Sequence, residues 1–260
     1  MSETALAAVA AGFFGLIFGS FFNVCIHRLP YHRSVIAPRS FCPNCEQSIA
    51  WYDNIPLLSF ALLRARCRFC RAPIAWRYPV VELGTGLLFY AIVWKFGVTP
   101  EAVKWLIFAS LLEILFWTDL ETRLLPDVLT LGGLAAALCF ALAVPDTGGV
   151  VASLLGALIL SLPLWAIATA YARVRGIQPP GLGDIKLLAL LGAFLGLQAG
   201  LLALLIGSLT GSVLGLGYIL GTGKNPKTHA LPFGSFLCAG GLIVIFFGGK
   251  LVRLWMGAGT

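Results

Sequence analysis

Long apolar runs separated by short polar segments dominate this sequence and predict a series of membrane-spanning helices. A span needs roughly 20 consecutive apolar residues, and most of the runs approach that length. The runs lie near residues 5–26, 79–97, 103–117, 128–144, 150–171, 185–198, 201–220 and 231–252. The pattern therefore predicts an all-α polytopic membrane protein with about eight transmembrane helices.

The uncharged stretch from 187 to 223 is short for two helices, yet two short spans are expected there, with a turn near Gln198–Gly200. A single span would move Lys224 and Lys227 away from the side that holds most of the other basic residues. The predicted turn thus depends on charge placement and not on a marked turn sequence.

Composition also places the chain among membrane proteins. Hydrophobic residues make up 59% of it and charged residues 11%, with a mean hydropathy of +0.92. A soluble globule cannot bury that apolar share, and the same composition excludes disorder, a coiled coil and a secreted disulfide scaffold.

One polar stretch, residues 28–78, interrupts the apolar pattern and predicts a cytoplasmic insertion. It holds eight of the 18 basic residues, namely Arg28, Arg33, Arg39, Arg64, Arg66, Arg68, Arg71 and Arg77. By the positive-inside rule the stretch is cytoplasmic and the N-terminus lies outside. No Lys or Arg precedes Arg28, so the first apolar run is expected to be a retained span and not a cleaved signal. Topology accounts for the net charge of +7 without a nucleic-acid partner.

Two Cys-x-x-Cys pairs in this polar loop predict a structural zinc site. Cys42 and Cys45 form the first pair and Cys67 and Cys70 the second, at a spacing close to that of zinc ribbons. The Arg-rich surroundings favour the thiolate form that binds metal. Two disulfides or four unrelated thiols are the alternative, although stable disulfides are rare in a reducing cytosol. The remaining cysteines are interpreted as small core residues: Cys25, Cys139 and Cys238.

Two aspartates far apart in the sequence are expected at the cytoplasmic membrane boundary. Asp119 ends the third predicted span, and Asp184 begins the sixth, directly after Gly181 and Gly183. If these helices pack together, the two carboxyls can share one proton, because like charges in close contact do not both ionise easily. One would act as general base on a water molecule while its protonated partner polarises a peptide carbonyl. The glycines can adopt positive φ and let an extended substrate strand approach closely.

Structural roles are open for the same acids. Asp184 suits the N-cap of a helix that follows a glycine-rich loop, and Asp119 can pair with Arg123 at a helix end. Glu82 and Glu113 also fall inside apolar runs and are expected to have a supporting role at best. A proton relay in a transporter would use the same residue types, and a non-enzymatic assembly factor with a zinc loop is a further alternative.

Motifs along nearly the whole chain are specific as an ordered set, although each is weak alone. They read GSFFNVCIHRLP at 19–30, CPNC at 42–45, WYDNIPLLSF at 51–60, CRFC at 67–70, RYPVVE at 77–82, TDLETRLLPD at 118–127, GLGDIKLLALLGAFLG at 181–196 and LPFGSF at 231–236. This set resembles the bacterial type IV prepilin peptidases, also called leader peptidases and prepilin N-methyltransferases.

The resemblance implies that Asp119 and Asp184 are the catalytic aspartates, with Asp127 as the main rival of Asp119. The GxGD motif at Asp184 also looks like that of presenilin-type intramembrane proteases, which implies an aspartyl mechanism. The loop with the four cysteines looks like the family's cytoplasmic zinc-binding insertion. Supporting residues are expected at Gly181, Gly183, Lys186 and Asp127. Ser235 stands where relatives commonly carry Pro, a departure that we expect to touch neither aspartate.

The family cuts a short basic leader after a Gly from type IV prepilins or type II secretion pseudopilins and then methylates the new N-terminus with S-adenosylmethionine. The resemblance thus implies a hydrolase of the bacterial inner membrane that is also a methyltransferase. No adenosyl-binding pattern is recognised, since GLGD lacks the third glycine of a dinucleotide loop. The expected organisation is a first transmembrane helix at 1–27, a cytoplasmic zinc-binding loop domain at 28–78 and a seven-helix membrane catalytic core at 79–260.

Overall fold

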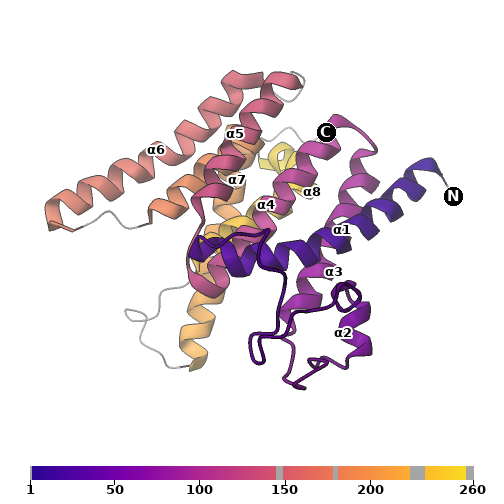
Figure 1. Cartoon of the computed structure of the whole chain (residues 1–260). Helices are drawn as coiled ribbons and strands as arrows, with labels where there is room; N and C mark the ends of the chain where they lie inside the picture. Colours follow the sequence, from indigo (N-terminus) through magenta and orange to yellow (C-terminus); the bar gives the residue numbers. More distant parts are fainter. Residues whose placement is uncertain (1, 145–148, 178–180, 223–231, 256–260) are drawn as a thin grey trace. The chain divides into compact units, whose positions relative to one another are not determined.

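The computed structural model describes residues 2–144, 149–177, 181–222 and 232–255, and these residues are helical apart from loops and two isolated β-bridges (Figure 1). Within these described ranges, five helices are long and apolar enough to cross a membrane: α1 (Glu3–Arg28), α3 (Arg77–Phe96), α6 (Gly149–Arg175), α7 (Leu182–Thr222) and α8 (Phe233–Trp255). The apolar α5 (Asp127–Ala143) is shorter, and α4 (Pro100–Thr122) carries several charged residues. The predicted all-α polytopic membrane class is confirmed.

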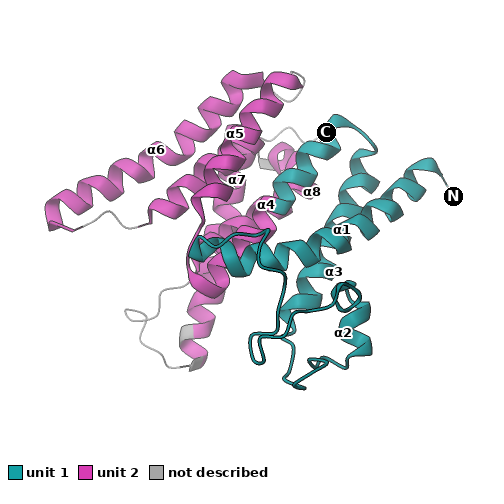
Figure 2. Cartoon of the chain, viewed as in Figure 1, with its two compact units in different colours: residues 1–110 teal, residues 111–260 magenta. Residues whose placement is uncertain are grey.

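The chain divides into two compact units, residues 1–110 and 111–260, which Figure 2 colours separately. Unit 1 contains α1, the short 3-10 helices η1 (Leu29–Tyr31) and η2 (Trp51–Asn54), α2 (Leu58–Leu62), α3 and the first part of α4. Unit 2 contains the rest of α4 together with α5, α6, α7 and α8.

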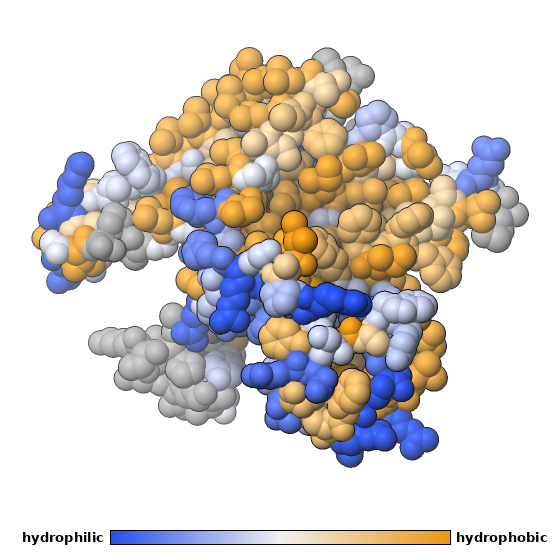
Figure 3. Space-filling model, in the orientation of Figure 1, coloured by the Kyte–Doolittle hydropathy of each residue, from blue (hydrophilic) through white to orange (hydrophobic). Residues whose placement is uncertain are grey.

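Apolar side chains cover the outer surface of the long helices. On α6, Val151, Leu158 and Ile167 are 70%, 47% and 69% exposed. Figure 3 shows apolar side chains over α5 and α6 at the top of the view, while hydrophilic ones gather around the loop between α1 and α3. A water-soluble surface rarely exposes so large a continuous apolar area, so these helices are suited to contact with lipid.

Glycines bring α1 and α3 of unit 1 into close contact. A Cβ atom added at Gly15 would lie 2.7 Å from the Thr85 carbonyl oxygen, and one at Gly19 would lie 2.7 Å from Glu82 Cα. The Asn23 side-chain amide also donates to the Tyr78 carbonyl at 3.1 Å. In lipid, helices associate through such close backbone packing and interhelical hydrogen bonds, because apolar side chains gain little by leaving the bilayer.

Helix α7 of unit 2 packs between α6 and α8, again through glycines. A Cβ at Gly192 would overlap the backbone of Gly156 on α6, and a Cβ at Gly156 would overlap Gly192 in return. On the α8 side, a Cβ at Gly207 would lie 2.9 Å from the Phe236 carbonyl oxygen. The position of α7 is therefore set by backbone contacts on two sides.

The predicted break between residues 187 and 223 is confirmed, but it lies at Gly196, two residues before the position expected near Gln198–Gly200. Gly196 has φ 75° and ψ 178°, whereas residues 198–200 are helical. Only glycine adopts such a conformation without strain. The placement of charges indicates on which side of the membrane a segment ends. It does not indicate which glycine departs from helical geometry. Lys224 and Lys227, on which the prediction of two spans depended, and Leu231 of the LPFGSF motif lie outside the described residues.

Replacement of Gly192 by Ala is expected to lower the free energy of unfolding by about 1–3 kcal/mol, because its Cβ would force α6 and α7 apart. Thermal unfolding of the purified protein in detergent micelles measures the change. Gly217→Ala on the same helix is the control, because nothing lies within 4 Å of its added Cβ, and it should leave stability unchanged or raise it by up to about 1 kcal/mol. Equal stability of the two variants would contradict the close packing of α6 on α7.

Candidate active site and metal centre

Two carboxylates from distant parts of the sequence lie near each other in unit 2. Asp119 is in the last turn of α4, and Asp184 is the third residue of α7. The charge of Asp119 acts on Asp184, and both act on the thiol of Cys238 in α8, so the three side chains are within electrostatic range of one another. Asp119 is 5% exposed, and Asp184 is partly buried. The structure therefore brings together the two aspartates that the sequence singles out.

Ser235 holds one oxygen of Asp119 with two hydrogen bonds. The Ser235 backbone N–H donates to Asp119 Oδ2 at 2.6 Å, and Ser235 Oγ lies 3.0 Å from the same oxygen and 2.9 Å from the Phe116 carbonyl. Ser235 is the third residue of α8, where backbone N–H groups have no partner within the helix. The start of α8 thus offers a donor and a partial positive charge to a buried carboxyl.

The expectation that Ser235 would touch neither aspartate is wrong. Ser235 follows Asp119 by 116 residues, and the contact forms only because the start of α8 returns to the end of α4. The preceding Gly234 permits this approach, since a Cβ there would lie 3.1 Å from the Asp119 carboxyl carbon. Gly234 and Ser235 form a pair of small residues after Phe233. The sequence alone does not indicate that this pair contacts the carboxyl of Asp119.

The glycines before Asp184 form the entry to α7. Gly181 has φ +73°, and the Ile185 N–H donates to its carbonyl at 3.2 Å, so Gly181 occupies the N-cap position. Asp184 lies within the first helical turn, and the alternative that it is the N-cap residue is wrong. A Cβ at Gly183 would lie 3.3 Å from the Leu125 side chain, which leaves little room for a larger residue.

Asp127, the rival of Asp119, is engaged in an ion pair. Lys186 Nζ lies 2.6 Å from Asp127 Oδ1, with side-chain exposures of 34% and 58%. Ion pairs this exposed contribute little to stability, but this one links the start of α5 to the start of α7, two residues beyond Asp184. Asp127 and Lys186 are therefore placed as structural neighbours of the aspartate pair.

The remaining acids have separate surroundings. Arg123 follows α4 with φ 57°, and its backbone N–H donates to the Asp119 carbonyl at 2.9 Å, while its charge acts on the Asp119 carboxyl. Glu113 is buried on α4 at 5% exposure. Glu82 belongs to unit 1, where its Oε2 accepts from the Leu57 backbone N–H at 2.8 Å. Glu82 thus anchors the polar loop to α3.

The four cysteines of the polar loop form one cluster. The Sγ atoms of Cys42, Cys45, Cys67 and Cys70 all lie within 4.8 Å of one another, and those of Cys42 and Cys70 are 3.8 Å apart. Zinc–sulfur bonds of about 2.3 Å in a tetrahedron place sulfur atoms about 3.8 Å apart. The cluster therefore has the ligand type and spacing that a tetrahedral metal ion requires.

Each cysteine pair lies on a turn of the same construction. The Cys42 N–H donates to the Gln47 carbonyl at 2.9 Å, and the Cys67 N–H donates to the Ala72 carbonyl at 2.8 Å. The turns are repeats offset by 25 residues, with identical residues at Arg39/Arg64, Cys42/Cys67, Cys45/Cys70, Ile49/Ile74, Ala50/Ala75 and Trp51/Trp76. This internal repeat was missed in the sequence, although the two Cys-x-x-Cys pairs mark it. The two turns of this repeat thus supply two thiols each to the cysteine cluster.

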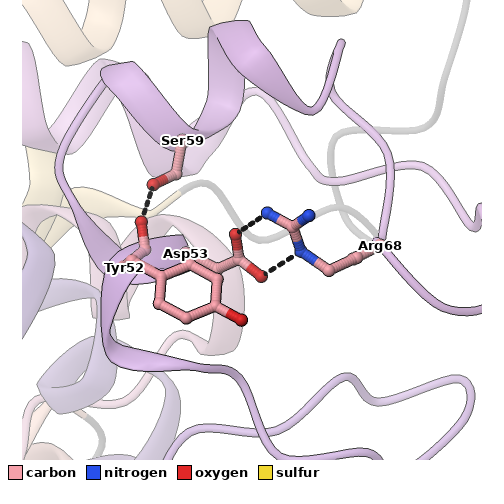
Figure 4. A network of polar contacts seen from close by, with 4 residues as sticks. All are labelled: Tyr52, Asp53, Ser59 and Arg68. Atoms are coloured by element: carbon pink, nitrogen blue, oxygen red, sulfur yellow. Dashed lines mark hydrogen bonds and ion pairs between the residues drawn. The ribbon is translucent and has the colours of Figure 1, made fainter.

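A polar network joins the second turn to η2 (Figure 4). Arg68, inside the second Cys-x-x-Cys pair, donates to both carboxylate oxygens of Asp53 at 2.7 and 2.5 Å. The hydrogen bond to Arg68 holds the pKa of Asp53 below its usual value. Ser59 Oγ donates to the Tyr52 carbonyl at 2.9 Å and fastens η2 to α2. These bonds position the loop around the cysteines without using any thiol.

Hydrogen bonds set the thiol chemistry of the cluster. The Ala72 backbone N–H and the Asn44 side-chain amide donate to Cys70 and lower the pKa of that thiol to about 6. At Cys45 the Gln47 N–H acts in the same direction, but desolvation and the neighbouring thiols outweigh it and raise the pKa to about 11. These donors therefore favour the thiolate form of Cys70. The sequence analysis predicted that the nearby arginines would favour the thiolate.

The fold and the site define a polytopic helical membrane protein with an aspartate pair and a four-cysteine cluster suited to a metal ion. The sequence matches the Bacterial Peptidase A24 N-terminal domain over residues 13–96 and the Type IV leader peptidase family over residues 106–216. The chain belongs to the type IV leader peptidase family.

Several relatives are named prepilin leader peptidase/N-methyltransferase. The protein from Myxococcus xanthus (strain DK1622) is 44% identical over 227 residues, which cover 86% of this chain and 67% of the relative. That from Klebsiella pneumoniae is 45% identical over 190 residues, covering 70% and 82%. That from Aeromonas hydrophila is 38% identical over 270 residues, covering 94% and 91%. No solved structure matches the chain.

Ser235→Ala is expected to lower the free energy of unfolding by about 1 kcal/mol, because a buried carboxyl loses one of its hydrogen bonds. Thermal unfolding in micelles measures this loss, which should shrink in an Asp119→Ala background. Ser161→Ala is the matched control, since that buried hydroxyl donates only to the Ala157 carbonyl of its own helix at 2.7 Å. A larger loss at Ser161 than at Ser235 would contradict the contribution of the Asp119 contact.

Proposed function

We propose that this protein is a membrane aspartyl endopeptidase that removes the basic leader from type IV prepilins or type II secretion pseudopilins after a Gly. The observation that carries the proposal is the aspartate pair: Asp119 and Asp184 lie within electrostatic range, and Asp119 is buried and held by Ser235. Membership of the leader peptidase family and the names of the relatives support the same reaction.

Asp119 is the proposed general base. Its Oδ2 atom takes both contacts with Ser235, so Oδ1 is the oxygen offered to a water molecule. A backbone donor suits a carboxylate better than a neutral acid. Because two neighbouring carboxyls do not both ionise easily, Asp184 is the proposed holder of the shared proton and the general acid.

The reaction follows from these two roles. Asp119 takes a proton from water as the water oxygen bonds to the scissile carbonyl carbon, and Asp184 gives its proton to the carbonyl oxygen. The tetrahedral diol then collapses and the C–N bond breaks. Asp119 passes its proton to the leaving amine, and Asp184 regains one from the diol, so both side chains return to their starting forms.

The surroundings of Asp184 suit a peptide substrate in extended form. Gly181 has no Cβ, and only Asp184 Oδ2 would lie within 4 Å of an added one, at 3.7 Å, which leaves the backbone beside the acid open to a second chain. A prepilin anchored in the inner membrane by its apolar helix would keep its basic leader on the cytoplasmic face. The proposed orientation has the N-terminus outside and both the cysteine cluster and the aspartate pair at the cytoplasmic side.

A structural zinc ion is the proposed occupant of the cysteine cluster. Four thiolate ligands, Cys42, Cys45, Cys67 and Cys70, would leave no open position for catalysis. The ion would add folding free energy to a loop with few buried apolar residues, since between residues 40 and 76 the buried side chains are those of Cys42 and Ser59.

Methylation of the new N-terminus completes the proposed function, because the relatives carry that activity in their names. S-adenosylmethionine would supply the methyl group, and the cofactor-binding residues are left unassigned. The proposed organisation is a first span at 1–27, a zinc-binding loop domain at 28–78 and a membrane catalytic core at 79–260.

Asp119→Asn and Asp184→Asn are each expected to lower kcat/KM for prepilin cleavage by about 10²–10⁴-fold, since each removes one proton-transfer group. Mass spectrometry of the N-terminal product, after incubation of purified protein with a prepilin and labelled methyl donor, measures cleavage and methylation together. Asp127→Asn should keep most of the activity, because that exposed carboxylate pairs with Lys186. Unchanged cleavage in either of the first two variants would reject the pair, and solute flux without proteolysis would favour a transporter.

Metal analysis of the purified protein is expected to give about one zinc ion per chain. Cys67→Ser should abolish metal retention, because three thiolates and a hydroxyl bind zinc more weakly than four thiolates. Cys139 is exposed on α5, so its interpretation as a core residue is wrong, whereas Cys25 and Cys238 are buried as expected. Cys139→Ser, outside the cluster, is the control and should keep the metal. Zinc-free protein with four reduced loop cysteines would refute the site.

A further inference from the structure

Unit 1 contains a cavity of about 390 Å³ between α1 and the loop that follows it. This volume falls within the range of small-molecule sites, roughly 300–1,000 Å³. Helix α1 contributes Ile17, Phe21 and Arg28 to the lining, and the loop contributes Arg39, Ser40 and Asn54. The loop also contributes apolar side chains, among them Val35, Ile36 and Ile49, so the two arginines lie in a lining that is otherwise largely apolar on both sides.

Arg28 is a buried cation in the wall of this cavity. The residue is 8% exposed, and its guanidinium donates to the carbonyls of Ser34 at 3.0 Å and Pro38 at 2.8 Å. These partners are neutral, and none of the residues that line the cavity is acidic. Because a buried charge is costly unless an opposite charge meets it, the cavity is suited to an anion. Arg39 adds a second positive charge to the lining.

The apolar side chains that α1 adds to the cavity suit the hydrocarbon part of an amphiphile. Ile17 and Phe21, one helical turn apart, are 60% and 46% exposed, and Phe14 continues the same face toward the N-terminus at 62%. This face belongs to a helix that is apolar enough to cross a membrane. An amphiphile could place its charged group at the arginines while its hydrocarbon follows the exposed side chains of α1.

We propose that this cavity binds the phosphate of an anionic phospholipid, with the acyl chains lying along Phe14, Ile17 and Phe21. Basic pockets beside membrane helices on the cytoplasmic side are suited to anionic headgroups. A methyl donor of the S-adenosylmethionine type fits less well: its carboxylate can meet an arginine, but its sulfonium and ammonium groups would find no acidic residue in the lining. The site is independent of the aspartate pair, and the inference does not depend on the proposed peptidase function.

Native mass spectrometry of the full chain in detergent micelles, titrated with phosphatidylglycerol or phosphatidylcholine, tests the site. The wild type should retain phosphatidylglycerol in preference to phosphatidylcholine. Arg39→Gln should weaken phosphatidylglycerol binding about fivefold, which corresponds to about 1 kcal/mol per basic residue. Arg64→Gln is the matched control, because Arg64 is the counterpart of Arg39 in the 25-residue repeat and does not line the cavity.

Arg28→Gln, checked for helical content by circular dichroism, should weaken binding further than Arg39→Gln if the variant folds. Equal retention of the two lipids, or equal loss in Arg39→Gln and Arg64→Gln, would overturn the proposal. Displacement of the lipid by inorganic phosphate at similar concentration would assign the cavity to a soluble anion. Displacement by S-adenosylmethionine would assign it to the methyl donor, and either result would reject the lipid.

Discussion

Close backbone contact between helices is the constraint on which the aspartate pair depends. Helix α7 meets α6 at Gly192 and α8 at Gly207, so its position is set from both sides. The first turn of α7 carries Asp184, and the first turn of α8 carries Ser235, which holds Asp119. In lipid there is no strong hydrophobic force to bring these helices together. The geometry of the two acids is thus a result of small residues some distance from them.

The apolar pattern was sufficient to predict the helices, because a bilayer demands long runs of one kind of residue. The pattern could not locate the break in α7, since three glycines at 192, 196 and 200 look alike in the sequence and only Gly196 leaves the helix. The cysteine spacing predicted the cluster because ligands on two tight turns are a local feature. The contact of Ser235 with Asp119 was out of reach, because it depends on how α8 packs against α4. The roles of the two aspartates remain proposals.

The cysteine loop has a polar framework of its own. Asp53 and Arg68 connect η2 to the second cysteine turn, and Glu82 ties Leu57 to α3. The Arg68 side chain is 48% exposed, whereas Asp53 is 8% exposed and takes two hydrogen bonds from the guanidinium. This two-point geometry fixes the direction of the turn. A loop preorganised in this way loses less conformational entropy when four sulfurs gather around an ion.

The hydrogen bond from the Ser235 backbone N–H to Asp119 is not removed by ordinary side-chain substitution. Alanine scanning removes hydroxyls and carboxylates, but every residue other than proline brings its own amide hydrogen to position 235. The shorter of the two contacts to Asp119 is therefore invisible to such a scan. A mutational map of this region would underrate the opening turn of α8, and only proline or a backbone ester would expose its contribution.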